Sequence, residues 1–307
     1  MRILVVGGTG FLGPPVVTRL SNLGHQVTVY HRGEHEAPLP FGVRHVHAPE
    51  AAIPVVSFPD ELTGLAWDVV LAMSPVGERD ASALMRTFRG VARRVVALSS
   101  GDVYRAYGVF RGSERGEADT RALVEDAPLR ETLYPYRGTT RTPTRTRTRT
   151  GTGLPTHLSE YEKIEVERAV QSDPAMPGTV LRLPAVYGPG DAQHRFGPAW
   201  RRIADGRPAI LLGRAHGLFR WTHGYVEDVA HAIVLAVTTE RARGRTYNVG
   251  EPSAPTMAER VEAFGRALGW TGAVTLVDEA RLPRELGQPG NFAQPLVYDT
   301  TRIRRDL

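Results

Sequence analysis

The chain of 307 residues contains no cysteine, and only one of its 38 Lys and Arg residues is lysine. Without cysteine it forms no disulfide, no thiolate metal site and no cysteine nucleophile. No apolar run approaches the roughly 20 residues that cross a bilayer, and the apolar run at Ile3 leaves no room for a signal peptide before it. We therefore expect a soluble, cytoplasmic protein, with a substantial core in one large lobe or two closely packed lobes.

The net charge of +5 comes from one low-complexity stretch, residues 137–153, in which Arg and Thr alternate. Its five arginines equal the whole excess of positive charge, so the rest of the chain is balanced. The stretch has no large apolar residue to bury, which predicts a solvated surface loop. Alternating arginines also suit nucleic-acid phosphates, but the loop lacks aromatic residues for base stacking, so nucleic-acid binding is not favoured.

Apolar runs alternate with helical segments along the first part of the chain, which predicts a doubly wound parallel α/β sheet. Strands are expected at 2–6, 26–30, 43–47, 68–72, 93–98 and 178–183. Helices are expected near 11–23, 78–90 and 157–172.

The pattern loosens after residue 184, where Gly, Pro and aromatic residues dominate 187–225. Helices near 226–238 and 256–268 flank a short strand near 246–249. We expect a dinucleotide-binding domain over 1–184 and a mainly substrate-binding region over 185–307, with 226–250 packing back on the sheet.

The clearest motif is Gly7-Gly8-Thr9-Gly10-Phe11-Leu12-Gly13, directly after the apolar run Ile3–Val6. Gly7 permits a tight turn, Gly10 lets the main chain approach a pyrophosphate, and Gly13 lets the next helix lie close to the strand. Free N–H groups at that helix start, aided by the helix dipole, then face the anion. The motif predicts a bound dinucleotide.

The second expected strand ends in Tyr30-His31-Arg32-Gly33. An NAD site commonly has an acid at this strand tip to hold the ribose 2′-OH, whereas Arg32 is suited to a 2′-phosphate. Glu34 remains an alternative, displaced acid. NADP is therefore favoured, with NAD as the second option.

Lys163 is the only lysine of an arginine-rich chain, which indicates a chemical need for an amine there. With this residue the chain resembles the extended short-chain dehydrogenase/reductase superfamily, as an atypical member of its NAD-dependent epimerase/dehydratase group. The resemblance covers nearly the whole chain. Its motifs are Gly7–Gly13, Ala97–Tyr104, Lys163 with Glu167, Leu181–Gly190, Tyr225–Ala230 and Tyr247–Gly250.

The resemblance implies a Rossmann sheet, and a Ser/Thr, a Tyr and a Lys beside the nicotinamide. By position Ser100 is the Ser/Thr, and Lys163 is the lysine that holds the ribose and lowers the tyrosine pKa. The tyrosine exchanges a proton with a substrate oxygen while hydride moves to or from the nicotinamide. The expected cofactor-binding residues are Gly7, Thr9, Gly10, Phe11, Leu12, Gly13, Arg32, Lys163 and Pro184.

The tyrosine departs from the family pattern. The family places it four residues before the lysine, where Ser159 stands, whereas Tyr161 precedes Lys163 by two residues, roughly 200° around a regular helix. Either the helix starts late and Tyr161 reaches the site from an irregular turn, or Tyr104 or Asp102 replaces it, or the usual catalysis is absent. The expected catalytic residues are Ser100, Tyr161 and Lys163.

We thus predict an NAD(P)-dependent oxidoreductase or epimerase that transfers hydride at a secondary alcohol or ketone of a sugar-like or small natural-product substrate. Ala185 and Trp221 stand where many sugar-nucleotide enzymes of the family carry Asn and Arg. The alternative is a non-catalytic NADP-binding protein, a sensor or an RNA-associated one. No metal site is expected, since His194 and His223 lack carboxylates at ligand spacing. Relatives often pair, which makes a homodimer a candidate assembly.

Overall fold

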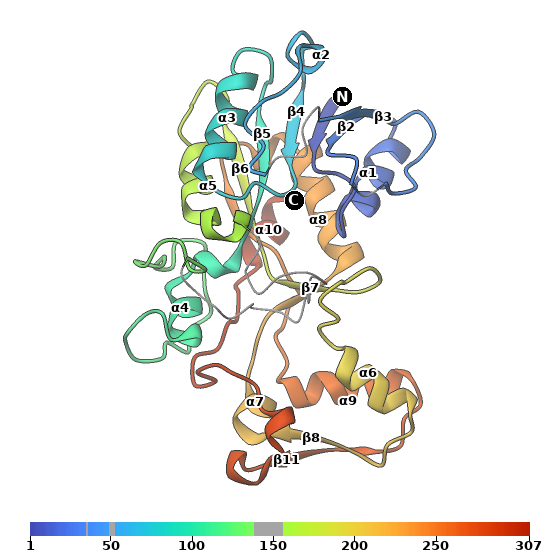
Figure 1. The fold of residues 1–307 in the computed structure, drawn as a ribbon, viewed down its shortest axis with the longest axis vertical. Helices are drawn as coiled ribbons and strands as arrows, with labels where there is room; N and C mark the ends of the chain where they lie inside the picture. Colours follow the sequence, from blue (N-terminus) through green and yellow to red (C-terminus); the bar gives the residue numbers. More distant parts are fainter. Residues whose placement is uncertain (35, 49–52, 138–155) are drawn as a thin grey trace.

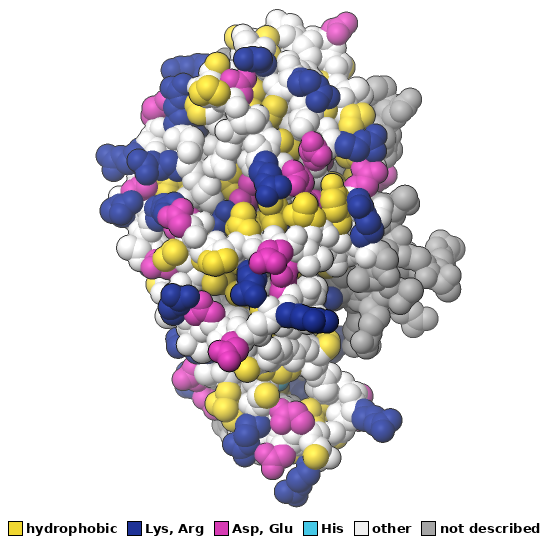
Figure 2. Space-filling view, turned by 90° about the vertical axis from the view of Figure 1, so that its left-hand side faces the viewer, with side chains coloured by type: hydrophobic (Ala, Val, Ile, Leu, Met, Phe, Trp, Pro, Cys, Tyr) yellow, Lys and Arg dark blue, Asp and Glu magenta, His cyan; other side chains and the backbone are white. Residues whose placement is uncertain are grey.

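The computed structural model describes every residue of the chain except 35, 49–52 and 138–155. A larger lobe built on a parallel sheet lies above a smaller lobe in the view of Figure 1. The Arg/Thr stretch, expected to form a surface loop, lies outside the described residues apart from Arg137. On the face drawn in Figure 2, acidic and basic side chains are interspersed, in line with the balanced charge of the rest of the chain.

Within the described residues, seven parallel strands form the central sheet in the order β10-β6-β5-β4-β1-β2-β3. They are β1 (Arg2–Val6), β2 (Gln26–His31), β3 (Arg44–His47), β4 (Val69–Ala72), β5 (Val95–Ser100), β6 (Gly178–Leu183) and β10 (Thr246–Asn248). The strand order reverses between β1 and β4, where open α/β sheets bind ligands at their carboxyl ends. The predicted doubly wound parallel fold is confirmed.

Helices cover both faces of this sheet (Figure 1). α1 (Gly13–Asn22) packs against α8 (Val226–Thr238) on one face, and α3 (Glu78–Phe88) packs against α5 (Lys163–Val170) on the other. Successive residues of a strand point to opposite faces, so Val5 joins the first core and Leu4 the second. Shorter helices in this lobe are α2 (Asp60–Thr63), α4 (Arg105–Arg111), α10 (Thr301–Asp306), η1 (Gly101–Val103), η2 (Thr156–Glu160) and η3 (Glu240–Ala242).

The smaller lobe packs around Ile203, Ile210 and Val261. It contains α6 (Gly197–Ala204), β8 (Ala209–Gly213), α7 (Arg214–Leu218), α9 (Met257–Ala267), β11 (Ala273–Val277), η4 (Glu279–Arg281) and η5 (Arg284–Leu286). β8 pairs in parallel with β11, and β7 (Ala185–Tyr187) pairs in parallel with β9 (His223–Tyr225) between the lobes. Within the described part of the chain, no helix is both long and apolar enough to span a bilayer.

The single helix expected over 157–172 is wrong at its start. The chain forms the 3₁₀ helix η2, leaves helical geometry at Tyr161 and Glu162, and enters α5 at Lys163. Glu162 has extended backbone angles (φ −153°, ψ 99°), and its carboxylate accepts the N–H of Ile164 at 2.9 Å. A carboxylate in this position caps a helix start, so helical spacing does not govern the direction of Tyr161.

Candidate active site

The glycine-rich turn between β1 and α1 has the backbone geometry that a dinucleotide needs. Gly7 has φ +88°, which L side chains rarely adopt, and its N–H donates to the carbonyl of Tyr30 at 2.9 Å. A Cβ on Gly13 would lie 2.1 Å from the Gly8 carbonyl oxygen, so a side chain there would push α1 off the strand. A Cβ on Gly10 would meet no described atom within 4 Å, so the turn faces open space at that point.

The first turn of α1 offers fewer hydrogen-bond donors than its glycine motif suggests. Pro14 and Pro15 lie in that turn, and proline has no N–H. The N–H of Gly13 donates to the carbonyl of Gly10 at 2.9 Å. The expectation of several free N–H groups at this helix start is therefore wrong. Phe11 and Leu12, two of the expected cofactor-binding residues, lie just before this helix.

Arg32 directly follows the last residue of β2 and forms an ion pair with Glu34, at 3.0 Å between Nη2 and Oε2. Both side chains are partly exposed, at 29% and 46%. Arg32, which we expect to bind a 2′-phosphate, is thus paired with Glu34, the alternative residue for binding the ribose hydroxyl. A 2′-phosphate at this position would compete with Glu34 for the Arg32 guanidinium.

Lys163 is buried at the first residue of α5, with 8% of its surface exposed. Its Nζ donates to the carbonyl of Leu98 at 3.3 Å and to the carbonyl of Pro75. Burial disfavours the charged amine and lowers the pKa of Lys163 to about 8, against the opposing effect of nearby carboxylates. The ammonium lies 5.5 Å from the centre of the Tyr161 ring.

The late start of α5 brings Tyr161 to the end of β5. Its hydroxyl donates to Asp102 Oδ2 at 2.8 Å, and Ser100 lies beside it. Ser100 is the last residue of β5, and its Oγ accepts the N–H of Asp102 at 3.2 Å. The structure therefore brings Ser100, Tyr161 and Lys163 together, whereas Ser159, at the family's tyrosine position, is exposed.

The expected lowering of the tyrosine pKa by lysine is wrong for this structure. Burial raises the pKa of Tyr161 well above its usual value, and the negative charge of Asp102 adds to this effect. Burial also raises the pKa of Asp102. The geometry explains why the Tyr161 pKa rises. The Lys163 ammonium donates to backbone carbonyls, whereas the Tyr161 hydroxyl donates to the carboxylate of Asp102. The Tyr161 hydroxyl therefore keeps its proton through the neutral range.

Tyr136 also belongs to this cluster, although it was not among the expected site residues. Its hydroxyl donates to Asp102 Oδ2 at 3.3 Å, and its ring centre lies 5.2 Å from that of Tyr161. Asp102 Oδ2 thus accepts hydrogen bonds from two phenol hydroxyls, while its buried Oδ1 has no hydrogen-bond partner in the described part of the chain. The pair Tyr134 and Tyr136 before the Arg/Thr stretch is a visible signal, but no local pattern connects it to β5.

A buried ion pair holds the segment that carries Tyr161. The side chains of Arg130 and Glu162 are both 0% exposed, with 3.0 Å between Nη2 and Oε1. Arg130 Nε donates to the carbonyl of Asp102, and the Glu162 N–H donates to the carbonyl of Val76 at 2.9 Å. This pair joins the start of α5 to the segments that follow β4 and β5.

Tyr104, considered as a replacement for the missing tyrosine, has a different role. It is fully buried, and its hydroxyl donates to Asn248 Oδ1 at 2.6 Å and accepts from Arg182 at 3.0 Å. A hydroxyl with these two partners inside the core does not fit proton exchange with a substrate. Asp102, the other replacement considered, does lie in the cluster around Tyr161.

Side chains of the expected substrate-binding region are engaged within the protein. His223 is 3% exposed, its Nδ1 donates to the Trp221 carbonyl at 2.8 Å, and burial lowers its pKa to about 3. Arg195 pairs with Asp191 at 2.8 Å. Pro184, expected at the cofactor, is buried in the link between β6 and β7.

The chain is similar in sequence to known proteins. Residues 132–250 match the family of NAD dependent epimerases/dehydratases. The chain is 30% identical over 295 residues to a 3-diazoavenalumate denitrifying reductase from a Streptomyces species, covering 94% of this chain and 88% of that protein. It is 29% identical over 282 residues to a 2′-dehydrokanamycin reductase from Streptomyces kanamyceticus, covering 88% of this chain and 67% of that protein.

Solved structures share the fold at lower sequence identity. A UDP-glucuronic acid 4-epimerase from Bacillus cereus, in complex with UDP-glucuronic acid and NAD, superposes with a TM-score of 0.66 at 15% identity, over 100% of this chain and 93% of that one. A short-chain dehydrogenase/reductase superfamily protein from Agrobacterium tumefaciens with bound NAD gives a TM-score of 0.65 at 19% identity, over 100% and 91%.

Proposed function

Because this chain belongs to the NAD-dependent epimerase/dehydratase family, in the extended short-chain dehydrogenase/reductase superfamily, we propose that it is an NADPH-dependent reductase of a ketone. It is an enzyme of a class that uses a nicotinamide cofactor. The observation that carries the more specific proposal is the Tyr161 hydroxyl, which donates to Asp102 at the end of β5 beside Lys163. In this proposal residues 1–184 bind the cofactor, and residues 185–307 mainly contact the substrate.

The residues at the carboxyl ends of β1 and β2 fit such a cofactor. The backbone of the Gly7–Gly13 turn faces open space at Gly10, which leaves room for a pyrophosphate. Arg32 would hold a 2′-phosphate, and Lys163 lies at the opposite end of this edge, beside Tyr161. When bound, the nicotinamide supplies the hydride.

The chain itself supplies the proton. Burial raises the pKa of Tyr161, so its hydroxyl keeps its proton at neutral pH, and it would turn from Asp102 Oδ2 to donate to a carbonyl oxygen that gains charge. In this proposal Ser100, the last residue of β5, donates a second hydrogen bond to the same oxygen. In this proposal Asp102 Oδ1, which is buried and has no hydrogen-bond partner among the described residues, accepts a hydrogen bond from a substrate hydroxyl, which favours a hydroxylated ketone.

The substrate class follows from the relatives and from two residues of the chain. Both Streptomyces relatives are named as reductases, and one is named for 2′-dehydrokanamycin. Ala185 and Trp221 stand where many sugar-nucleotide enzymes of this family have Asn and Arg. We therefore propose an unactivated sugar-like or small natural-product ketone in place of a nucleotide sugar.

We expect the purified protein to oxidise NADPH when it is mixed with a panel of hydroxylated ketones, including oxidised aminoglycosides and keto sugars. The measurement is NADPH absorbance, with quantification of the alcohol formed. One alcohol per NADPH consumed is the expected result. An epimerase would restore its cofactor within each cycle and consume none, so isomer formation without NADPH loss would contradict the proposal.

The cofactor preference has its own control in the same assay. Arg32→Ala is expected to weaken NADPH binding about tenfold, the effect of roughly 1.4 kcal/mol from one charged contact, and to leave NADH binding unchanged. Glu34→Gln is the matched variant and is expected to tighten NADPH binding, because it releases Arg32 from its ion pair. Equal losses for both cofactors in Arg32→Ala would contradict an NADP preference while leaving the reductase proposal intact.

The pH dependence should report Lys163 rather than Tyr161. The lysine pKa is lowered to about 8 while the tyrosine pKa is raised, so Lys163 loses its proton first as the pH rises. We expect kcat/KM for ketone reduction to fall above pH 8 by about tenfold per pH unit. In Lys163→Arg, whose guanidinium stays charged, this alkaline limb should move beyond pH 10 even though the maximal rate is lower. An unchanged limb in Lys163→Arg would assign it to another group.

A further inference from the structure

Three histidines and a glutamate meet at the edge of the sheet, outside the cluster around Tyr161. His31 is the last residue of β2, His45 and His47 lie on the edge strand β3, and Glu36 lies in the connection between the two strands. β2 and β3 pair in a register that sets Val29 beside His45 and His31 beside His47. The three imidazoles therefore lie on one face of the sheet.

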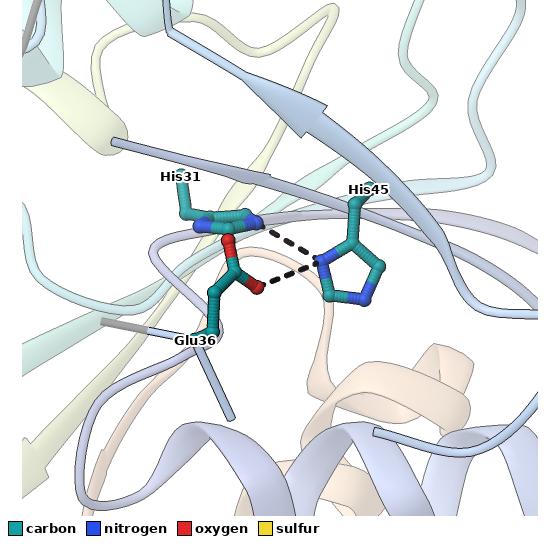
Figure 3. A group of neighbouring side chains, drawn as sticks. All are labelled: His31, Glu36 and His45. Carbon is teal, nitrogen blue, oxygen red and sulfur yellow. Dashed lines mark hydrogen bonds and ion pairs between the residues drawn. The ribbon is translucent and has the colours of Figure 1, made fainter. Parts of the chain in front are cut away.

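The polar atoms of this group converge. His31 Nε2 lies 3.0 Å from His45 Nδ1, and His45 Nδ1 lies 3.8 Å from Glu36 Oε2. Figure 3 draws both contacts as dashed lines. One possible ligand atom from each of His31, Glu36 and His45 lies within 4.8 Å of the others. His47 adds a fourth group, with 2.9 Å between its Nε2 and Glu36 Oε1.

We propose that His31, Glu36 and His45, with His47 in reach, form a binding site for a divalent transition-metal ion such as zinc. Zn–N bonds of about 2.0–2.1 Å in a tetrahedral site separate neighbouring ligand atoms by about 3.3 Å. The distances of 3.0 and 3.8 Å lie on either side of this value, so small side-chain shifts would complete the geometry. Imidazole nitrogens with a carboxylate oxygen suit zinc, nickel or copper better than magnesium or calcium.

The burial of the group fits an ion that enters from solvent. His31 is 5% exposed and forms the closed end, whereas the side chains of Glu36 and His47 are 59% and 54% exposed. Glu36 supplies the one negative charge, and its carboxylate already lies between two imidazoles. The exposed side leaves room for His47 or a water molecule as fourth ligand.

The hydrogen bonds around His31 limit the strength of the site. The Gly33 N–H donates to His31 Nδ1 at 3.2 Å, so neutral His31 carries its proton on Nε2 and donates it to His45. A metal on Nε2 moves that proton to Nδ1, where it meets the Gly33 N–H. The Gly33 amide must then turn away, and a glycine with φ +74° can do this without a side-chain clash. The site should thus bind more weakly than one whose histidine is backed by a carbonyl.

A metal at this position would join the end of β2, the connection after it and β3 into one unit. The same connection carries Arg32, so the ion would stiffen the segment proposed to hold the 2′-phosphate.

The test is a titration of the full-length, tag-free protein with zinc by calorimetry, and with cobalt by visible absorption. We expect one ion per chain and the strong absorption bands of tetrahedral cobalt. His45→Ala should abolish the cobalt bands, and Glu36→Gln, at an exposed position, should weaken zinc binding about tenfold or more. Zinc should also raise the melting temperature of the wild type and leave that of His45→Ala unchanged.

His231→Ala is the matched control, because His231 is exposed on α8 and distant in sequence from the group. It should bind both metals as the wild type does. The proposal would be overturned if the wild type bound neither metal, or if His45→Ala and Glu36→Gln both bound one equivalent with wild-type affinity. Because Glu36 lies on the surface, folding of Glu36→Gln is not in question even if His45→Ala proves unstable.

Discussion

Tyr161→Phe is expected to lower kcat/KM for ketone reduction by about 10²–10⁴-fold, the usual effect of losing a general acid. Phenylalanine keeps the ring that packs at 5.2 Å from Tyr136, so the substitution removes the hydroxyl and little else. Because Asp102 retains the Tyr136 hydroxyl as a partner, the local structure should survive. The measurement is steady-state kinetics with the best ketone of the panel, together with NADPH affinity, which should not change.

Ser159→Ala is the control for this experiment. Ser159 stands at the position where the family has its tyrosine, but it is exposed, so its loss should leave the rate within about twofold of wild type. The opposite pattern, a normal rate in Tyr161→Phe and a large loss in Asp102→Asn, would make Asp102 the proton donor. Unchanged rates in both variants would remove this cluster from the reaction altogether.

Arg182→Met is expected to destabilise the fold by about 3–5 kcal/mol, because it leaves a buried carboxylate without its counter-charge. Arg182 and Glu167 have side chains only 6% exposed and form two parallel hydrogen bonds of 2.9 and 2.7 Å. Ser99 donates a third to Glu167 at 2.6 Å, and Arg182 also reaches Tyr104. The measurement is the free energy of unfolding from urea denaturation.

Two further variants separate the charge from the packing. The double variant Arg182→Met with Glu167→Leu removes both charges and should recover a large part of the lost stability. Arg168→Met removes the ion pair between Arg168 and Glu165 on α5, the helix that also carries Glu167. Arg168 is 63% exposed, so this variant should change the free energy of unfolding by less than about 1 kcal/mol. Equal effects of Arg182→Met and Arg168→Met would show that burial does not amplify the Arg182 interaction.

The fold was accessible from the sequence because its signals are local. The apolar segments 2–6 and 178–183 predicted β1 and β6 with the bounds that the structure shows. The periodic segment 226–238 likewise coincides with α8. The turn after β1 was readable because only glycine tolerates φ +88° at Gly7 and the close packing at Gly13. Pro14 and Pro15 were equally visible, and their missing N–H groups should have lowered the number of expected donors.

The chemistry around Tyr161 was less accessible because it depends on long-range contacts. The helix start at Lys163 follows from Glu162 turning back to cap it, and Glu162 in turn is fixed by Arg130, 32 residues earlier. The direction of the Tyr161 pKa shift could not be predicted from the sequence either. It depends on how deeply the ring is buried and on which group accepts the hydrogen bond of the hydroxyl. The alternation in His45-Val46-His47 indicates two histidines on one face of a strand. That His31 joins them could not be predicted from the sequence, because it depends on the register between β2 and β3.

The start of α5 at Lys163 also matters for how such chains are recognised in genome data. A search pattern that demands tyrosine four residues before lysine would pass over this chain, although a phenol stands at the end of β5 beside the lysine. The diagnostic local string is Tyr161-Glu162-Lys163, in which the middle residue is a helix cap and the tyrosine lies just outside the helix. A pattern built on that string, combined with Ser100-Gly101-Asp102 after β5, would collect related chains that share the shifted spacing.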